Sequence, residues 1–157
     1  MKSPKRVFNS LAVLAVALVL APAANAAYPS KMDVTVELWS GVAEPLSLTA
    51  ASWIPPGTDL SSYVIPADHP TVSLALTLAN PRNDSASFRL GSDGKECEFK
   101  LGHEAKFQWF SVNPAPEKSA SARSVGQVAV GCSASVIKGT DSSSAYTVRF
   151  VMKHITR

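Results

Sequence analysis

The side chains that carry most enzyme chemistry are sparse in this sequence, and their spacing fits no catalytic constellation. The histidines His69, His103 and His154 show neither His-x-His nor His-x-x-x-His spacing, which argues against a metal site. No Gly-x-Ser-x-Gly motif accompanies the many serines, so a hydrolase nucleophile elbow is not indicated. His103 and Glu104 could form a general-base pair, but we interpret them as surface residues of a short turn, since catalysis also needs a shaped pocket. We therefore expect a protein that is not an enzyme, with no metal and no cofactor.

The acidic residues are scattered singly, except for Glu96 and Glu98. Residues two apart in a strand share one face of the sheet, so these two carboxylates are neighbours in an extended chain. A glycosidase needs two carboxyl groups that flank the same sugar bond. We interpret Glu96 and Glu98 as solvated residues on an outer face instead.

The first 26 residues have the organisation of an export signal. Lys2, Lys5 and Arg6 precede an apolar run over residues 11–20, and the small-x-small sequence Ala-Asn-Ala at 24–26 follows it. The apolar run is too short to cross a bilayer, which takes about 20 residues of helix. We predict a signal peptide over residues 1–26 and an exported mature chain that has no membrane span.

The charge balance changes once this leader is set aside. The whole chain has 15 Lys and Arg against 12 Asp and Glu, and the leader holds three of the basic residues and none of the acidic ones. The mature chain is therefore close to neutral. A neutral chain lacks the basic stripe that neutralises phosphates, so we expect no nucleic-acid partner and no binding to an anionic membrane surface.

The two cysteines, Cys97 and Cys132, both lie in the mature chain. Export would place them in an oxidising compartment, where two thiols usually pair. The alternative is a metal site or a catalytic thiol, but neither cysteine has a Cys-x-x-Cys or Cys-x-x-His neighbour. We expect a disulfide, which would close a loop of about 35 residues and contribute roughly 3–4 kcal/mol in the chain-entropy model.

Strict alternation of apolar and polar residues, the period of a half-buried strand, dominates the mature chain. It is clearest over residues 32–38 and 72–78. Further strands are expected at 46–49, 86–90, 97–101, 107–112, 128–132 and 146–152. In this phase Cys97 and Cys132 both point inward. Residues 117–123 are expected to form one helical turn.

Turn residues separate these runs, as in Pro55-Pro56-Gly57 and Gly91-Ser92-Asp93-Gly94. Seven or eight strands at about ten-residue spacing predict an all-β fold, an antiparallel immunoglobulin-like β-sandwich. We divide the mature chain into an N-terminal strand or donor extension over residues 27–40 and a β-sandwich domain over residues 41–157.

Three tryptophans are candidates for ligand contact. Trp39, Trp53 and Trp109 could stack against a sugar or form an exposed apolar contact surface. The alternative is that they fill the core and the edge of the sandwich, since aromatic residues dominate core burial.

The first strand of the mature chain carries the main functional hypothesis. Its apolar residues Met32, Val34, Val36 and Leu38 lie on one face. The strand either belongs to the sandwich of its own chain or is a donor strand that completes the sheet of another subunit. A donor strand gains affinity from main-chain hydrogen bonds and from side chains that fill a groove. Burial of the four side chains would contribute roughly 1.5–3 kcal/mol each.

These features together resemble those of chaperone-usher fimbrial subunits. The run Met-Asp-Val-Thr-Val-Glu-Leu at 32–38 is similar to the opening strand of CS1-type and common-pilus-type major subunits. Gly139-Thr140, a Ser-rich gap and Tyr-Thr-Val-Arg-Phe at 146–150 are similar to their closing strand. The resemblance covers the layout of most of the mature chain, with matches of residue type in these two pieces.

The resemblance implies an incomplete immunoglobulin-like fold that a donor strand completes, and a fimbrium that polymerises by donor-strand exchange for adhesion. Met32, Val34, Val36 and Leu38 would be the donor residues. The implied partners are like subunits, a periplasmic chaperone and an outer-membrane usher, with the periplasm as the route to an extracellular fimbrium. The alternative is a periplasmic or secreted β-sandwich binding module for a carbohydrate or protein ligand, which would use the tryptophans and the Pro-rich loops.

Overall fold

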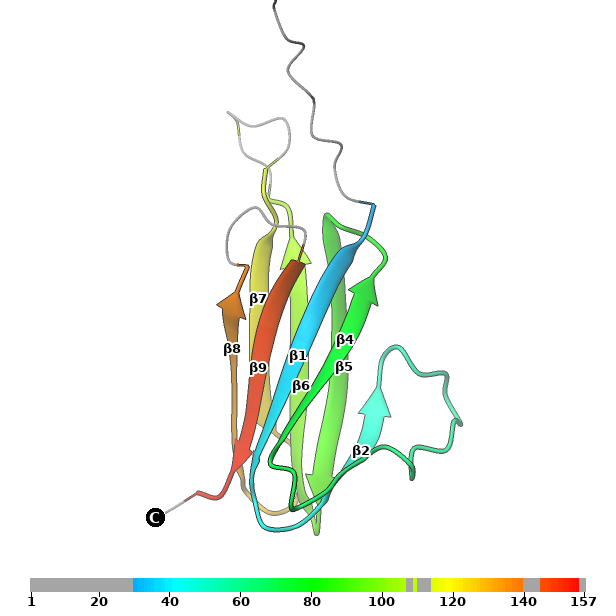
Figure 1. Ribbon diagram of the computed structural model, residues 1–157, viewed down its shortest axis with the longest axis vertical. Coiled ribbons are helices and arrows are strands. Elements are labelled where there is room, and N and C mark those ends of the chain that lie inside the picture. The colour runs from blue at the N-terminus through cyan, green and yellow to red at the C-terminus, as the bar shows by residue number, and fades with distance from the viewer. Residues whose placement is uncertain (1–29, 107–108, 110–113, 140–144, 156–157) are drawn as a thin grey trace, which may run out of the picture.

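Most of the alternating runs form strands in the computed structural model, which describes residues 30–106, 109, 114–139 and 145–155 (Figure 1). The strands are β1 (Met32–Gly41), β2 (Leu46–Ala51), β3 (Val64–Ile65), β4 (Thr71–Leu78), β5 (Asn83–Ser92), β6 (Lys95–Glu104), β7 (Glu117–Ser124), β8 (Gly131–Lys138) and β9 (Ala145–Lys153). Because these strands stack as two sheets, the expected β-sandwich is confirmed, with more strands than the seven or eight expected.

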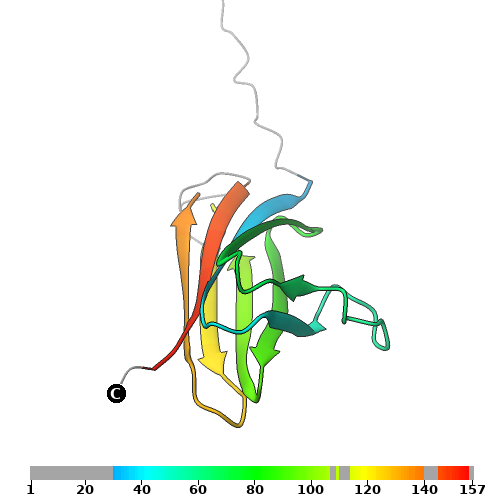
Figure 2. The same ribbon diagram turned by 60° about the horizontal axis from the view of Figure 1, so that its bottom comes forward.

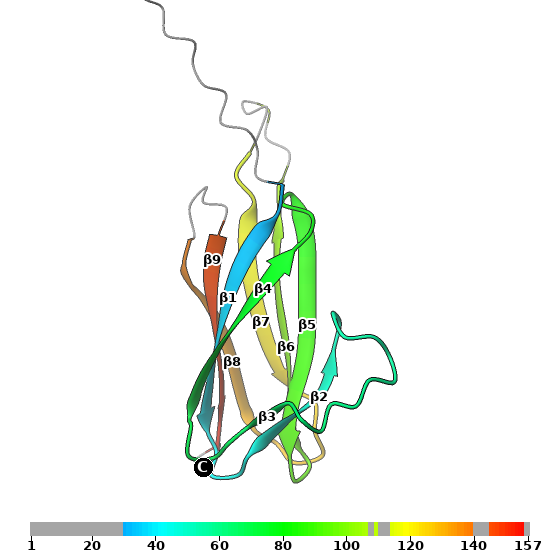
Figure 3. The same ribbon diagram turned by 45° about the vertical axis from the view of Figure 1, so that its right-hand side comes forward.

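The two sheets differ in how their strands are ordered. Sheet A has the order β4-β1-β9-β8, and sheet B has the order β3-β2-β5-β6-β7. All neighbouring strands are antiparallel except β1 and β9, which run parallel. Figures 2 and 3 show the two layers face to face, with β2 and the segment after it projecting away from the body on the β4 side.

The core lies between the sheets and has an aromatic centre. Phe88 and Phe99 of sheet B contact Phe150 of sheet A, with ring centroids 4.8–5.3 Å apart. All three side chains are buried. Pairs of rings at such distances add about 0.5–1.5 kcal/mol beyond their area burial, so this cluster ties β5 and β6 to β9.

A disulfide joins the sheets at the opposite margin from β4. Cys97 on β6 bonds to Cys132 on β8, and their Cα atoms are 5.9 Å apart. The expected pairing is therefore confirmed. Cys97 is completely buried and Cys132 partly buried, so the bond closes the β7–β8 side of the sandwich.

Two sequence expectations were wrong about the elements beside this disulfide. Residues 117–123 were expected as a helical turn, but Glu117–Ser124 forms strand β7, paired along its length with β6. A strand was expected at 128–132, whereas β8 begins at Gly131 and continues to Lys138. Val128 instead donates its backbone N–H to Gly94 O at 2.9 Å. The strand expected at 107–112 lies outside the described residues, except for Trp109. The predicted signal peptide, residues 1–26, also lies outside them.

The turn expected at residues 91–94 is confirmed as the link between β5 and β6. Asp93 and Gly94 both have positive φ, at 49° and 77°. Two successive residues with positive φ match the twist of a tight hairpin, and glycine adopts this conformation without a Cβ clash.

Candidate functional site

Strand β1 is an interior strand of sheet A and is buried on its inner face. Met32, Val34, Val36 and Leu38 are 1%, 2%, 0% and 5% exposed. The strict alternation of the sequence thus becomes a strand whose every second side chain enters the core. In this structure the four donor-strand candidates contribute to the core of their own chain.

Both edges of β1 form ladders within the same chain. On one side, residues 32–39 pair antiparallel with β4, with Met32 opposite Leu78 and Trp39 opposite Thr71. On the other side, residues 33–41 pair parallel with β9. β1 is therefore paired along both edges and buried on its inner face. Its removal would leave an apolar slot between β4 and β9.

The outer face of β1 has a polar attachment to β9. Arg149 donates from Nε and Nη2 to Glu37 Oε2 at 3.0 and 2.9 Å. The same guanidinium lies 4.6 Å from the ring centroid of Trp39, within the range of a cation–π contact. The hydrogen bond from Arg149 lowers the pKa of Glu37 below its ordinary value, and the positive charge of Arg149 adds to this effect. Glu37 is therefore an ionised anchor of β1 at neutral pH.

A second polar contact holds the opposite edge of β1. Thr77 Oγ1 on β4 donates to Asp33 Oδ1 at 2.9 Å, and the two residues are opposite each other in the ladder. This bond shows that the side chains at this register position meet on the outer face of sheet A.

An apolar groove of about 440 Å³ lies beside β4, where the two sheets diverge. Its lining includes Leu48, Trp53, Tyr63, Val72, Leu74 and Leu76. The β4 side chains Val72, Leu74 and Leu76 point toward the core but are only partly buried. The sandwich is thus closed at its β7–β8 side by a disulfide and open at its β4 side.

The three tryptophans do not form one binding face. Trp39 lies on the outer face of sheet A and Trp53 lies in the groove, where its ring contacts Phe88 with centroids 5.6 Å apart. Trp109 is exposed and lies in the connection between β6 and β7. Trp53 is therefore the tryptophan that an apolar ligand in the groove would meet.

The interpretation of His103 as a surface residue was wrong. Its side chain is 3% exposed, and Nε2 lies 2.8 Å from the backbone oxygen of Asn80. The ring packs edge-on against Tyr146, with centroids 6.1 Å apart. Burial raises the pKa of Tyr146 above its ordinary value. The alternation of Cys97, Phe99 and Leu101 continues to His103 and was the signal for its burial. The sequence did not identify Tyr146 as the partner, because the contact joins β6 to β9.

The interpretation of Glu98 as solvated was also wrong. The Glu98 side chain is 10% exposed and accepts hydrogen bonds from Arg89 on β5 and Arg123 on β7. The Arg123 hydrogen bond is the main reason why the pKa of Glu98 is lowered, and Arg89 adds to it. Glu98 therefore ties three strands of sheet B together on their outer face.

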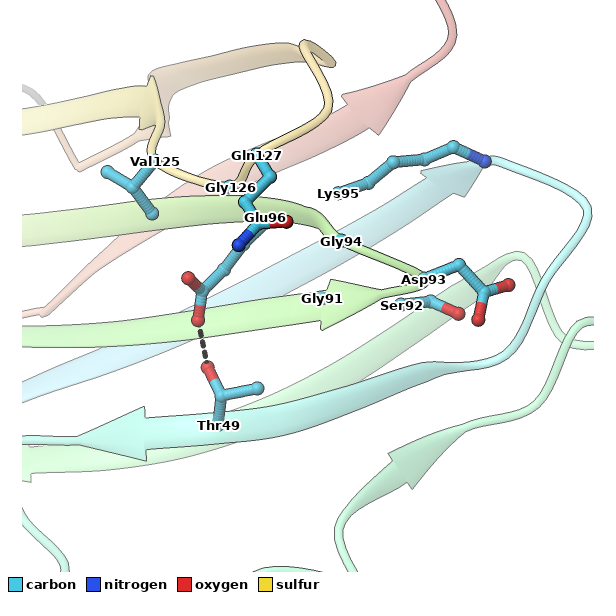
Figure 4. Close-up of a pocket in the computed structure, with 10 residues that line it drawn as sticks. All are labelled: Thr49, Gly91, Ser92, Asp93, Gly94, Lys95, Glu96, Val125, Gly126 and Gln127. Carbon is cyan, nitrogen blue, oxygen red and sulfur yellow. Dashed lines mark hydrogen bonds between the residues drawn. The ribbon is translucent and has the colours of Figure 1, made fainter.

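A polar hollow of about 470 Å³ surrounds the β5–β6 turn (Figure 4). Thr49 and Glu96 both line it, and Thr49 donates a hydrogen bond to Glu96. Figure 4 shows Lys95 pointing away from this pair, and its ammonium group lies 2.9 Å from Glu44. Gly126 packs tightly here, since a Cβ would lie 2.3 Å from Gly94 O. The hollow thus contains paired polar groups around a closely packed turn.

Neither a family model nor a curated protein sequence matches this chain. Within the described ranges, no three His, Cys, Asp or Glu residues are grouped as a metal site. The same part of the chain contains no helix with the length and apolarity needed to cross a membrane. The candidate functional site consists of β1, between β4 and β9, and the groove beside β4.

Proposed function

We propose that the chain is an exported structural subunit of a chaperone-usher-type fimbria, in which β1 of one copy fills the slot between β4 and β9 of the next. The observation that carries this proposal is the position of β1. The first strand of the described chain occupies the interior of sheet A, between two strands that follow it in sequence. Such a strand can leave without interrupting the covalent path through the other eight strands.

The slot accepts a strand in either direction. Because β1 is antiparallel to β4 and parallel to β9, β4 and β9 run antiparallel to each other. Any strand between them makes one parallel and one antiparallel ladder, whichever way it points. The backbone pairing therefore does not by itself favour the direction seen within one chain.

The side chains of β1 also tolerate reversal. If the strand is turned about Thr35, Met32 exchanges places with Leu38, and Val34 with Val36, so apolar residues still face the core. The same reversal brings Asp33 to the position opposite Arg149, where Glu37 lies in the observed direction. A carboxylate would thus face Arg149 in both directions.

The direction of insertion decides the form of the assembly. β1 ends beside the start of β2, at the end of the sandwich where β9 also ends (Figure 1). Exchange in the observed direction would bring together the ends of two copies at which β1 and β9 end. Each copy could then donate β1 to the other, and the assembly would stop at a closed dimer. Exchange in the reversed direction would bring this end of one copy to the opposite end of the next, and such head-to-tail contacts continue without limit.

The rest of the sandwich has features that would preserve it while β1 is away. The Cys97–Cys132 bond links the sheets at the margin remote from β4, and the Phe88–Phe99–Phe150 cluster links them at the centre. An empty slot would expose apolar side chains and two unpaired strand edges, which promote aggregation. The proposal therefore includes a periplasmic chaperone that covers the slot and an outer-membrane usher that orders the exchange.

A disulfide lock tests this proposal. Asp33→Cys with Thr77→Cys would tie β1 to its own β4, since these side chains already meet. We expect the full chain, expressed for export, to form SDS-resistant multimers that the lock abolishes. A matched lock on the outer face of sheet B, Ser87→Cys with Lys100→Cys, leaves β1 untouched and should leave the multimers intact. Multimers that persist with β1 locked would contradict the proposal.

The groove with Trp53 favours a second candidate, a binding module for an apolar part of a ligand. The same preparation separates the two functions. A chain that stays monomeric with and without the β1 lock, and whose tryptophan fluorescence responds to a ligand, would support the binding module.

A further inference from the structure

The edge strands of the two sheets differ in how they are protected from pairing with another chain. Natural edges are kept apart by charges, by proline, by bulges or by shortness. β3 has only two residues, β7 begins with Glu117 and Lys118, and β8 ends with Lys138. β4 has none of these features. Its eight residues, Thr-Val-Ser-Leu-Ala-Leu-Thr-Leu, carry no charge and no proline, and its register with β1 has no bulge.

The outer edge of β4 has no strand beside it among the described residues. Eight residues at about 3.4 Å each make this edge about 27 Å long. The groove next to it is lined by uncharged side chains throughout. Trp53, Tyr63 and Val64 at its rim are 39%, 51% and 43% exposed. The unpaired edge of β4 thus lies next to a continuous apolar patch, and this combination indicates a contact surface.

The sequence of β4 matches itself in reverse. Residues 71–77 read Thr-Val-Ser-Leu-Ala-Leu-Thr, and an antiparallel partner with Leu74 at the centre places Thr71 opposite Thr77 and Val72 opposite Leu76. Ser73 then lies opposite Ala75. Similar residues therefore meet at every position, and the uncharged surface of one copy meets the uncharged surface of the other. Self-complementarity of this kind is what a two-fold interface requires.

We propose that β4 pairs with β4 of a second copy about a two-fold axis at Leu74. The pair would join the two A sheets into one continuous sheet. The half-buried side chains Val72, Leu74 and Leu76 of both copies would then face a shared apolar interior over the two grooves.

The expected area makes this a reversible contact. A stable interface buries about 800 Å² per partner, which an edge of about 27 Å does not reach through its backbone alone. Trp53 and Tyr63 at the groove rim supply the additional apolar surface. We therefore expect a dimer that dissociates on dilution.

This contact is separate from the proposed exchange of β1. It uses the edge of β4 that faces away from β1, and it leaves the slot filled. A β4-paired dimer should dissociate in SDS, whereas a β1-exchanged multimer should resist it.

Paired charges on the exposed face of β4 test the inference. In the proposed register Ser73 and Ala75, both of which are exposed on the outer face, are opposite each other across the axis. Sedimentation velocity of the full chain should show a concentration-dependent dimer. Ser73→Lys with Ala75→Lys should abolish this SDS-sensitive dimer, as should Ser73→Glu with Ala75→Glu, because like charges would face each other. Mixing the two variants should restore a one-to-one heterodimer.

The controls separate lost pairing from lost folding. Ser133→Lys with Ser135→Lys places the same charges on the β8 edge and should leave the dimer intact. A thermal melt of each variant checks that it folds. If the charged variants do not fold, Leu74→Cys provides a second measurement, since two copies should join through the introduced thiols at the axis under mild oxidation. A parent chain that forms no SDS-sensitive dimer, or an SDS-sensitive dimer that persists in the folded lysine variant, would overturn the inference.

Discussion

Glu37 on β1 lies directly opposite Arg149 on β9 and accepts two hydrogen bonds from its guanidinium group. The two residues are 112 positions apart in sequence, so this ion pair joins the first strand of the described chain to the last. If β1 is exchanged between copies, the pair must break in one chain and form again between two. Under the proposed function, Glu37 and Arg149 would therefore contribute to the barrier to exchange and to the final assembly.

Acid should loosen β1. The pKa of Glu37 is lowered in the folded chain from an ordinary value of 4.5. Its stabilising effect is thus complete above pH 4.5 and is lost as the pH falls through the lowered pKa. We expect the exchange of β1 between fluorescently labelled copies to accelerate below pH 4.5. Glu37→Gln should exchange faster at neutral pH and show a weaker acid response, whereas an unchanged rate would exclude this role for the ion pair.

Val36→Asp should expel β1 and leave the rest of the sandwich folded. Val36 is completely buried, and an unpaired carboxylate in that position is too costly to keep there. We expect residues 30–41 to become sensitive to protease, and the SDS-resistant multimers to disappear, while the near-ultraviolet circular dichroism of the core persists.

A synthetic peptide of residues 30–41 provides the matched rescue of this variant. It should bind the emptied slot and raise the melting temperature, whereas the same peptide with Val36→Asp should not. Global unfolding of the variant without rescue would mean that β1 is an inseparable part of its own core.

The sequence predicted the strands with strong alternation and missed those with small side chains. β1 and β4 were predicted because Val, Leu and Met recur at every second position. The apolar residues that β7 packs against the core are the small residues Ala120 and Ala122. Alanine with flanking Glu and Lys favours a helix in local propensity. Pairing with β6 overrides this preference.

The partners of β1 could not be predicted from the sequence, for a related reason. Periodicity identifies which side chains face inward, but it contains no information about which strands lie side by side. The parallel pairing of β1 with β9 and the burial of His103 against Tyr146 both join distant segments. The disulfide was predicted from the expected oxidising compartment, and the inward phase of both cysteines fitted that prediction.

Loss of the disulfide should lower the stability of the sandwich formed by β2–β9 more than it weakens the pairing of β1 with β4 and β9. Cys97→Ser with Cys132→Ser removes a link between residues 35 apart, which costs about 3–4 kcal/mol by loop entropy. We expect a lower midpoint in urea and no folded product when Val36→Asp is added. A double serine variant as stable as the parent would show that the sheets do not depend on this bond.

Glu98 should make sheet B sensitive to acid. Its pKa is lowered in the folded chain by hydrogen bonds from Arg123 and Arg89. The stabilisation is therefore present above the ordinary pKa of 4.5 and disappears as the pH falls below it. The melting temperature of the parent chain should fall between pH 5 and pH 3, roughly the range in which such carboxylates titrate. The melting temperature of Glu98→Gln should be lower at pH 7 and should change less between pH 5 and pH 3. If the melting temperatures of the variant and the parent fall in parallel, Glu98 is not the group responsible.

The direction of strand exchange is the most direct test of the central claim. Reversed insertion about Thr35 would place Asp33 of one copy opposite Ser73 of the next, whereas insertion in the observed direction places Asp33 opposite Thr77. A copy with Asp33→Cys is mixed with a copy with Ser73→Cys under exchange conditions, and each single variant alone is the control. If β1 inserts in the reversed direction, the two introduced cysteines, one from each kind of copy, will form a disulfide in the SDS-resistant multimers of the mixture. Multimers without this cross-link, or no multimers at all, would contradict the central claim.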